Sequence, residues 1–128
     1  MTRFVIDSWA WVEYLRGSEA GQKVRKAVER EEEFITHVVT IAEIASKFAR
    51  ERMDVDGAWR AITTLSKIEG LDETDAKDAG LLHASVKEKR SNFSLADAFV
   101  LHTARKMNAK VLTGDPDFRG MDEALMLK

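Results

Sequence analysis

The sequence predicts an α/β fold in which helices cover both faces of a central, mostly parallel sheet of four or five strands, making three layers. Two observations support this prediction: short apolar runs that resemble buried strands, and longer amphipathic stretches that separate them. Strands that alternate with helices pair in parallel, and helices then cover both faces of the sheet. No repeat, low-complexity tract or long linker divides the chain, so we expect one domain over residues 1–128.

The expected elements follow one another along the chain. Apolar runs of strand length occupy residues 4–6, 34–35, 111–112 and 125–127, and a short strand near residues 68–71 would complete the set. The first strand leads into a short helix that carries two tryptophans. Apolar residues at helical spacing predict further helices over residues 20–30, 41–50, 58–67, 76–89 and 95–106.

The composition is that of a soluble globular protein. A chain of 128 residues with 45% hydrophobic content can fill a core. The absence of cysteine excludes disulfides, thiolate zinc sites and cysteine nucleophiles, and it fits a reducing compartment. The N-terminus MTRFVIDSW lacks the pattern of a signal peptide, and no apolar run could span a bilayer. We therefore expect a cytoplasmic protein with no membrane partner.

Four acidic residues mark one edge of the predicted sheet. Asp7 closes the first strand, Asp115 follows VLTG, and Glu43 and Asp97 lie near expected helix starts. Ligands of open parallel sheets bind at the carboxyl ends of the strands, where these helices begin. Several ionised carboxylates in one cleft raise one another's pKa or require a cation, and oxygen ligands suit Mg²⁺ or Mn²⁺. The pattern therefore favours a divalent metal site.

Helix capping offers another explanation for each acid taken singly. Thr40 with Glu43 has the spacing of a capping box, and Ser94 with Asp97 resembles one. The first acid could cap the first helix, and the fourth could open a turn before proline. Capping does not account for the specific residues that surround all four acids.

Those surroundings resemble the PIN-domain ribonucleases, especially the VapC-type toxins of type II toxin–antitoxin pairs. The resemblance runs from Val5 to Phe118, and SLADA followed by VLTGD is its most specific part. The segments that carry it are FVIDSWAWVEYL, TIAEIASKFAR and FSLADAFVLHTARKMNAKVLTGDPDF.

The resemblance implies a PIN-like α/β/α fold and a set of site residues. The acids that match catalytic and metal-binding positions are Asp7, Glu43, Asp97 and Asp115. Three further residues match accessory positions: the hydroxyls Ser8 and Thr113, and the acid Asp117. Ser8 could equally be a helix cap, and Thr113 an ordinary strand residue.

The implied activity is hydrolysis of RNA phosphodiester bonds by a water that one or two Mg²⁺ or Mn²⁺ ions activate. Asp7, Asp97 and Asp115 would be direct or water-bridged ligands, and Glu43 a ligand or a water-positioning base. The resemblance also implies a cognate antitoxin and a homodimer as partners. The sequence leaves the number of ions open.

The overall charge gives little support for RNA binding. The formal net charge is −2, but without the four site acids 22 − 4 = 18 acidic residues face 20 basic ones. Two local basic clusters could meet phosphates. They could also be solvated helix ends, where cations complement the helix dipole. These clusters are Lys47, Arg50 and Arg52, and Lys87, Lys89 and Arg90.

Three other functions share parts of this pattern. A phosphoacceptor receiver domain would have adjacent acids after its first strand and a Lys-Pro pair after its last, whereas here Asp7 precedes serine and the only proline is Pro116. A haloacid-dehalogenase-like phosphatase needs a second aspartate where Trp9 stands. A non-catalytic PIN-like RNA- or protein-binding domain could retain the acids as caps.

Histidines and tryptophans are weaker candidates for function. His37, His83 and His102 form no motif, so we expect structural or exposed histidines. Trp9 and Trp11 could stack on RNA bases, or at least one could pack in the core. Trp59 is expected to pack between two helices, beside an apolar groove that a partner helix could enter.

Overall fold

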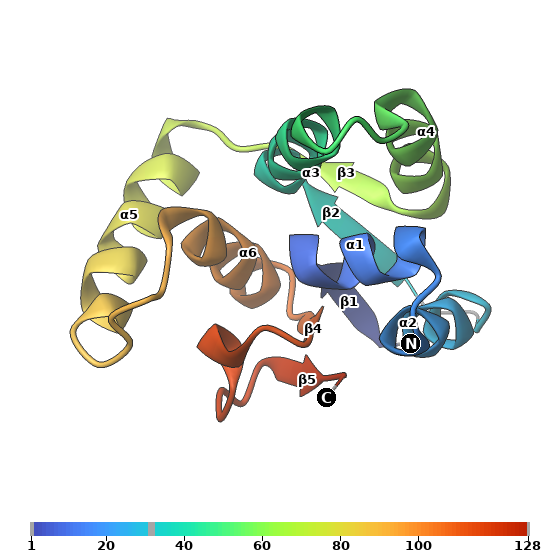
Figure 1. Cartoon of the computed structure of the whole chain (residues 1–128). Coiled ribbons are helices and arrows are strands. Elements are labelled where there is room, and N and C mark those ends of the chain that lie inside the picture. Colours follow the sequence, from blue (N-terminus) through green and yellow to red (C-terminus); the bar gives the residue numbers. More distant parts are fainter. Residues whose placement is uncertain (1, 31–32, 128) are drawn as a thin grey trace.

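The computed structural model describes residues 2–30 and 33–127, and these form a five-stranded sheet covered by helices (Figure 1). The first half of the chain contains β1 (Arg3–Ile6), α1 (Ser8–Arg16), α2 (Glu19–Val28), β2 (Glu33–His37), α3 (Val38–Arg50) and α4 (Val55–Leu65). The second half contains β3 (Lys67–Glu69), α5 (Glu73–Lys87), α6 (Leu95–Lys106), β4 (Lys110–Thr113), the 3₁₀ turn η1 (Pro116–Phe118) and β5 (Ala124–Met126). Among the described residues, no helix has the length and apolar character needed to cross a membrane.

The sheet has the strand order β3-β2-β1-β4-β5, and all its strands are parallel. Val5 of β1 pairs with Ile35 of β2 on one side and with Val111 of β4 on the other. The chain builds outward from β1 through β2 and β3, then returns to place β4 on the opposite side. In parallel sheets such a reversal leaves a ligand-binding crevice at the carboxyl ends of the two strands involved, here β1 and β4.

Alternating strand residues pack on the two faces, as the two-residue repeat of a strand requires. Phe4 and Ile6 join a core under α1, α2, α3 and α4, whereas Val5 joins a second core under α6. Helix α5 lies outside α6 and packs against it (Figure 1). The predicted α/β architecture with its parallel sheet is therefore confirmed, including the short β3.

Three predicted helix starts are wrong, because α3, α4 and α5 each begin three residues earlier than expected. Asp54 caps α4 and Asp72 caps α5. Helix α3 begins at Val38, three residues before the expected start, because the His37 ring caps it: Val39 N donates to His37 Nδ1 over 3.0 Å. Thr40 is consequently inside the first turn, fully buried, and its Oγ1 has no hydrogen-bond partner within the described chain. The Thr40–Glu43 capping box does not form, and Glu43 lies in the second turn of α3.

Candidate metal centre

Asp7 is fixed at the carboxyl end of β1 by hydrogen bonds to both carboxylate oxygens. Its Oδ1 accepts from Ala10 N at 2.9 Å, which caps α1, and its Oδ2 accepts from the Thr113 hydroxyl. The residue is only 4% exposed. Burial raises the pKa of Asp7 to about 7, against the effect of these hydrogen bonds, and the charges of Asp115 and Asp97 raise it further.

Asp115 follows β4 and is tied to Asp7 through Thr113. Asp115 N donates to Thr113 Oγ1 at 2.9 Å, so this hydroxyl contacts both acids at once. Asp115 Oδ1 then accepts from Asp117 N at 2.9 Å and caps η1. The hydroxyl and the turn together set the separation of the carboxylates that follow β1 and β4.

Gly114 allows this turn to lie against α1. A Cβ built on Gly114 would stand 2.3 Å from the indole ring of Trp9, closer than any real side chain permits. The ring of Trp9 therefore occupies the space beside the backbone that leads into Asp115. Only glycine fits here without a shift of one or the other.

Asp97 stands in the first turn of α6 and takes part in a complete capping box. Ser94 N donates to Asp97 Oδ2 at 2.9 Å, and Asp97 N donates to Ser94 Oγ at 3.0 Å. Burial raises the pKa of Asp97 to about 6, helped by the charges of Asp115 and Asp117 and opposed by the bonds to Ser94. The capping box therefore fixes the Asp97 carboxylate in a position close to Asp115 and Asp117.

Glu43 approaches the same place from α3. Burial raises its pKa to about 7, and the charges of Asp97 and Asp115 add to the effect. Three of the four predicted acids are therefore helix or turn caps as well as members of the cluster, whereas Glu43 has no capping role.

The tightest group of oxygens belongs to Asp97, Asp115 and Asp117. Each contributes one carboxylate oxygen, and these atoms lie within 4.8 Å of one another. Burial and the charge of Asp115 raise the pKa of Asp117, while Arg90 and Lys87 partly oppose the rise. Asp7 and Glu43 lie outside this group but close enough for Asp97 and Asp115 to affect their pKa values.

This donor set fits a hard divalent cation. Carboxylate oxygens alone suit Mg²⁺ or Mn²⁺. The raised pKa values show that burial, and to a lesser degree the neighbouring acids, destabilises the charged carboxylates, a cost that a bound cation would offset. The residues at the sheet edge can therefore hold such an ion.

A cleft of about 670 Å³ leads from the acids along α1 and α3, and we call it the α1–α3 cleft. Ser8 and Trp9 line it, beside the charged residues Glu13, Arg16, Glu43, Lys47, Arg50 and Asp115. Nothing in the local sequence marked Arg16, because its ion pair with Glu51 joins residues 35 positions apart.

Of the other two tryptophans, Trp11 is part of the core and Trp59 is exposed. Trp11 is fully buried and donates from Nε1 to Thr36 Oγ1 at 3.0 Å, so it belongs to the core. Trp59 is 54% exposed, and the expectation that it packs between helices is wrong. It lies at the edge of a small apolar hollow between α3 and α4.

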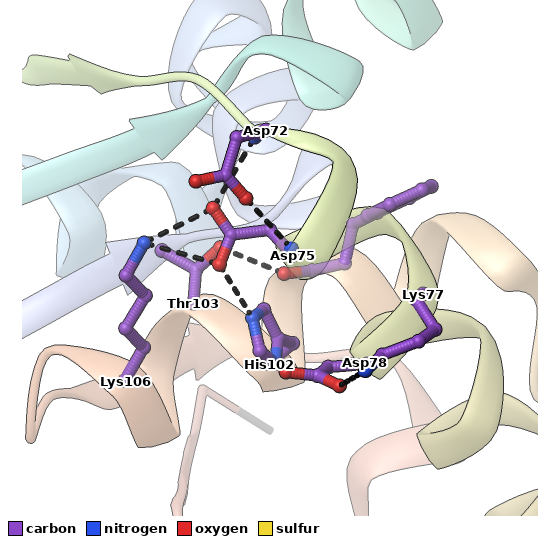
Figure 2. A network of polar contacts seen from close by, with 8 residues as sticks. Asp72, Asp75, Lys77, Asp78, His102, Thr103 and Lys106 are labelled. Atoms are coloured by element: carbon purple, nitrogen blue, oxygen red, sulfur yellow. Dashed lines mark hydrogen bonds and ion pairs between the residues drawn. The ribbon is translucent and has the colours of Figure 1, made fainter.

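The three histidines serve structure, as expected. His37 caps α3 and stacks on Phe99, and His83 Nε2 lies 3.1 Å from the carbonyl oxygen of Phe93. His102 Nε2 lies 3.1 Å from Asp75 Oδ1, and Lys106 donates to the same carboxylate, which joins α6 to α5 (Figure 2). These bonds lower the pKa of Asp75.

Comparison with known proteins identifies the family. The profile of the PIN domain matches residues 4–124. The chain belongs to the PIN domain family. This membership accounts for the acids at the switch point and sets aside the receiver and dehalogenase-like alternatives. No curated protein matches the sequence.

Solved structures with this PIN domain's fold include several toxins. Mycobacterium tuberculosis VapC20, described as a sarcin-ricin loop cleaving toxin, has a TM-score of 0.76 at 16% identity, covering 94% of this chain and 95% of that one. DNA-bound VapBC from Salmonella typhimurium has a TM-score of 0.73 at 15% sequence identity, and the match covers all of both chains. A toxin–antitoxin complex from Klebsiella pneumoniae has a TM-score of 0.70 at 14% sequence identity, and the match covers 97% of each chain. The likeness confirms the fold that the sequence resemblance implied.

Proposed function

We propose that this PIN domain is a metal-dependent endoribonuclease that hydrolyses RNA phosphodiester bonds with water, and that it acts in the cytoplasm as the toxin of a toxin–antitoxin pair. The observation that supports this most strongly is the group of three aspartate oxygens within 4.8 Å at the β1–β4 crevice. Two more acids with raised pKa values lie beside it.

The protein's own groups divide the work by position. Asp97, Asp115 and Asp117 would hold a Mg²⁺ or Mn²⁺ ion, and Asp7 would act as a further ligand, directly or through water. The Thr113 hydroxyl holds Asp7 and Asp115 in fixed positions, because it donates to Asp7 Oδ2 and accepts from Asp115 N. Glu43, with its pKa raised to about 7, is suited to position the attacking water and accept its proton. One or two bound ions would supply an activated nucleophile and offset the phosphate charge.

The solved structures with a similar fold suggest which partners this protein has. One neighbouring solved structure is named a toxin–antitoxin complex and another is DNA-bound VapBC, and this chain covers 97% and 100% of the chains that it matches in them. We infer that a cognate antitoxin binds this protein and that the toxin forms a homodimer.

The test is cleavage of a mixed RNA pool by the purified protein with Mg²⁺ or Mn²⁺. We expect cutting that stops with EDTA and in Asp97→Asn, because the variant loses a charged ligand. It should stay folded, since asparagine can still accept from Ser94 N and even a lost cap costs only about 1 kcal/mol. Asp72→Asn is the matched control, because Asp72 caps α5 in a similar box away from the site. This control should cut normally.

Two outcomes would contradict the proposal. Normal cleavage by Asp97→Asn would place the site elsewhere. Absence of both cleavage and Mn²⁺ binding in the wild-type protein would favour a non-catalytic PIN-like binding domain.

A further inference from the structure

The α1–α3 cleft is acidic where it meets the metal centre and basic farther along. Glu43, Lys47 and Arg50 are spaced four and then three residues apart, so they lie on one face of α3 in successive turns. At a rise of about 1.5 Å per residue, Lys47 lies about 6 Å and Arg50 about 10 Å along the helix from Glu43. Arg16 adds a third cation from α1. Among the described residues that line the cleft, Glu13 is the only other charged one away from the metal centre.

Two of these cations converge on one carboxylate. Arg16 Nη2 lies 2.9 Å from Glu51 Oε1 and 3.3 Å from Oε2, while Lys47 Nζ lies 3.5 Å from Oε2. The three side chains are 38% to 41% exposed, so an anion arriving from solvent can reach them. Arg50 is held nearby through Ser46, whose Oγ accepts from Arg50 Nε at 3.4 Å.

A guanidinium and an ammonium that share one carboxylate form a site that a phosphate can also occupy. Both anions present oxygens to the same donors, and arginine recognises phosphate and carboxylate with the same fork of N–H groups. The carboxylate of Glu51 therefore stands where a phosphate of a bound strand would be held, and it competes for the same charges.

We propose that Arg16, Lys47 and Arg50 bind backbone phosphates of the RNA strand next to the scissile phosphate, and that Glu51 weakens this binding by occupying two of the three cations. The inference rests on the proposed ribonuclease function, because the scissile phosphate is placed at the metal centre.

An RNA strand fits this cleft better than an acidic peptide does. Trp9 lines the cleft together with the acids and the cations, and single-stranded nucleic acid is bound by basic grooves that carry aromatic side chains. The metal centre at the other end also requires a ligand whose anionic groups continue past the basic residues. A phosphodiester backbone has this regular repeat of charge.

The experiment measures binding without cleavage, in the Asp97→Asn background with Mg²⁺, by fluorescence anisotropy of a short labelled single-stranded RNA. Because these cations are half-exposed, Arg16→Gln and Lys47→Gln should each weaken binding by about two- to fivefold. Each should also reduce the slope of log affinity against log salt by about 0.7. Glu51→Gln should strengthen binding by about threefold, because it removes a competing charge. Improved binding cannot result from misfolding.

Lys77→Gln supplies the matched control. Lys77 is a well-exposed lysine on α5, which lies on the other side of α6 from α1 (Figure 1), and it has an ion pair with Asp78. The Lys77→Gln substitution removes the same charge as Lys47→Gln and should leave RNA affinity unchanged. A loss equal to that of Lys47→Gln would show that only overall charge matters and would overturn the proposal.

Two further outcomes would overturn it. Unchanged RNA affinity in both Arg16→Gln and Lys47→Gln would mean that the basic end does not bind the strand. Poly-glutamate that binds as tightly as RNA of equal charge, with the same dependence on Glu51, would assign the cleft to an acidic peptide. Neither result depends on cleavage, so failure of the proposed ribonuclease activity would be seen separately in the cutting assay.

Discussion

Replacement of Asp7 by asparagine is expected to stabilise the metal-free protein at neutral and alkaline pH. Asp7 is almost fully buried among other acids, and its pKa rises from the usual 3.8 to about 7. Asparagine has the same shape without the charge. Its Oδ1 can still accept from Ala10 N, and its amide group can donate to the Thr113 hydroxyl.

The pKa difference sets an upper limit to the effect. A rise from 3.8 to about 7 corresponds to about 4 kcal/mol of lost stability once Asp7 is ionised in the folded state. Because the folded-state pKa of Asp7 is raised, this residue destabilises the fold least below pH 4, and its cost grows as the pH rises to 7. Relaxation and the altered bond to Thr113 reduce the expected gain in Asp7→Asn to about 2 kcal/mol, or about 8 °C in Tm, at pH 8.

Urea unfolding in EDTA at pH 4, 5.5, 7 and 8 tests this reasoning. The gain in Asp7→Asn should be below about 1 kcal/mol at pH 4 and reach its full value above pH 7. Asp54→Asn is the control, because Asp54 also caps a helix but is exposed, and this variant should show no gain at pH 8. If Asp7→Asn is destabilised equally at pH 4 and pH 8, the buried charge is not the source of strain and the reasoning is refuted.

Three other predictions concern the site and its support. Gly114→Ala should lower the free energy of unfolding by about 1–3 kcal/mol and RNA cleavage by about tenfold or more, because its Cβ would meet the Trp9 ring at 2.3 Å. Unfolding and cleavage assays measure the two effects, and unchanged values would contradict the tight packing. Thr36→Val should cost about 1–3 kcal/mol in urea unfolding, because the buried Trp11 N–H loses its acceptor; a neutral change would show that another acceptor is available. Mn²⁺ affinity should rise from pH 6 to pH 8 with release of protons, since Asp7 has a pKa of about 7 and must ionise to act as a ligand. Calorimetry in two buffers measures this, and constant affinity would contradict it.

The parallel sheet could be predicted because its central strands β1, β2 and β4 are buried on both faces and contain short apolar runs. The residues of β1 illustrate this, since Phe4 and Val5 enter different cores yet are both apolar. The start of α3 could not be predicted in the same way. A histidine ring serves as its cap, and histidine is not among the residues that usually signal a helix start.

The sequence predicted the acids of the candidate site that follow strands or begin helices, but not the place of Asp117 in the turn η1. Asp7, Asp97 and Asp115 were expected at the sheet edge, and their carboxylates do gather at the β1–β4 crevice. The sequence assigned Asp117 only an accessory place, whereas its oxygen lies in the tightest group because η1 turns it toward Asp97. Such proximity depends on the turn and leaves no local sequence pattern.

The source of the oxygen added during RNA cleavage tests the central claim most directly. Cleavage with Mn²⁺ in ¹⁸O-labelled water, followed by mass spectrometry of the product ends, identifies the attacking group. Hydrolysis at the carboxylate cluster predicts a terminal phosphate with one labelled oxygen, formed by the wild-type protein and absent with EDTA or in Asp97→Asn. Cyclic phosphate ends without label, formed equally in EDTA, would show attack by the RNA's own 2′-hydroxyl and contradict the account.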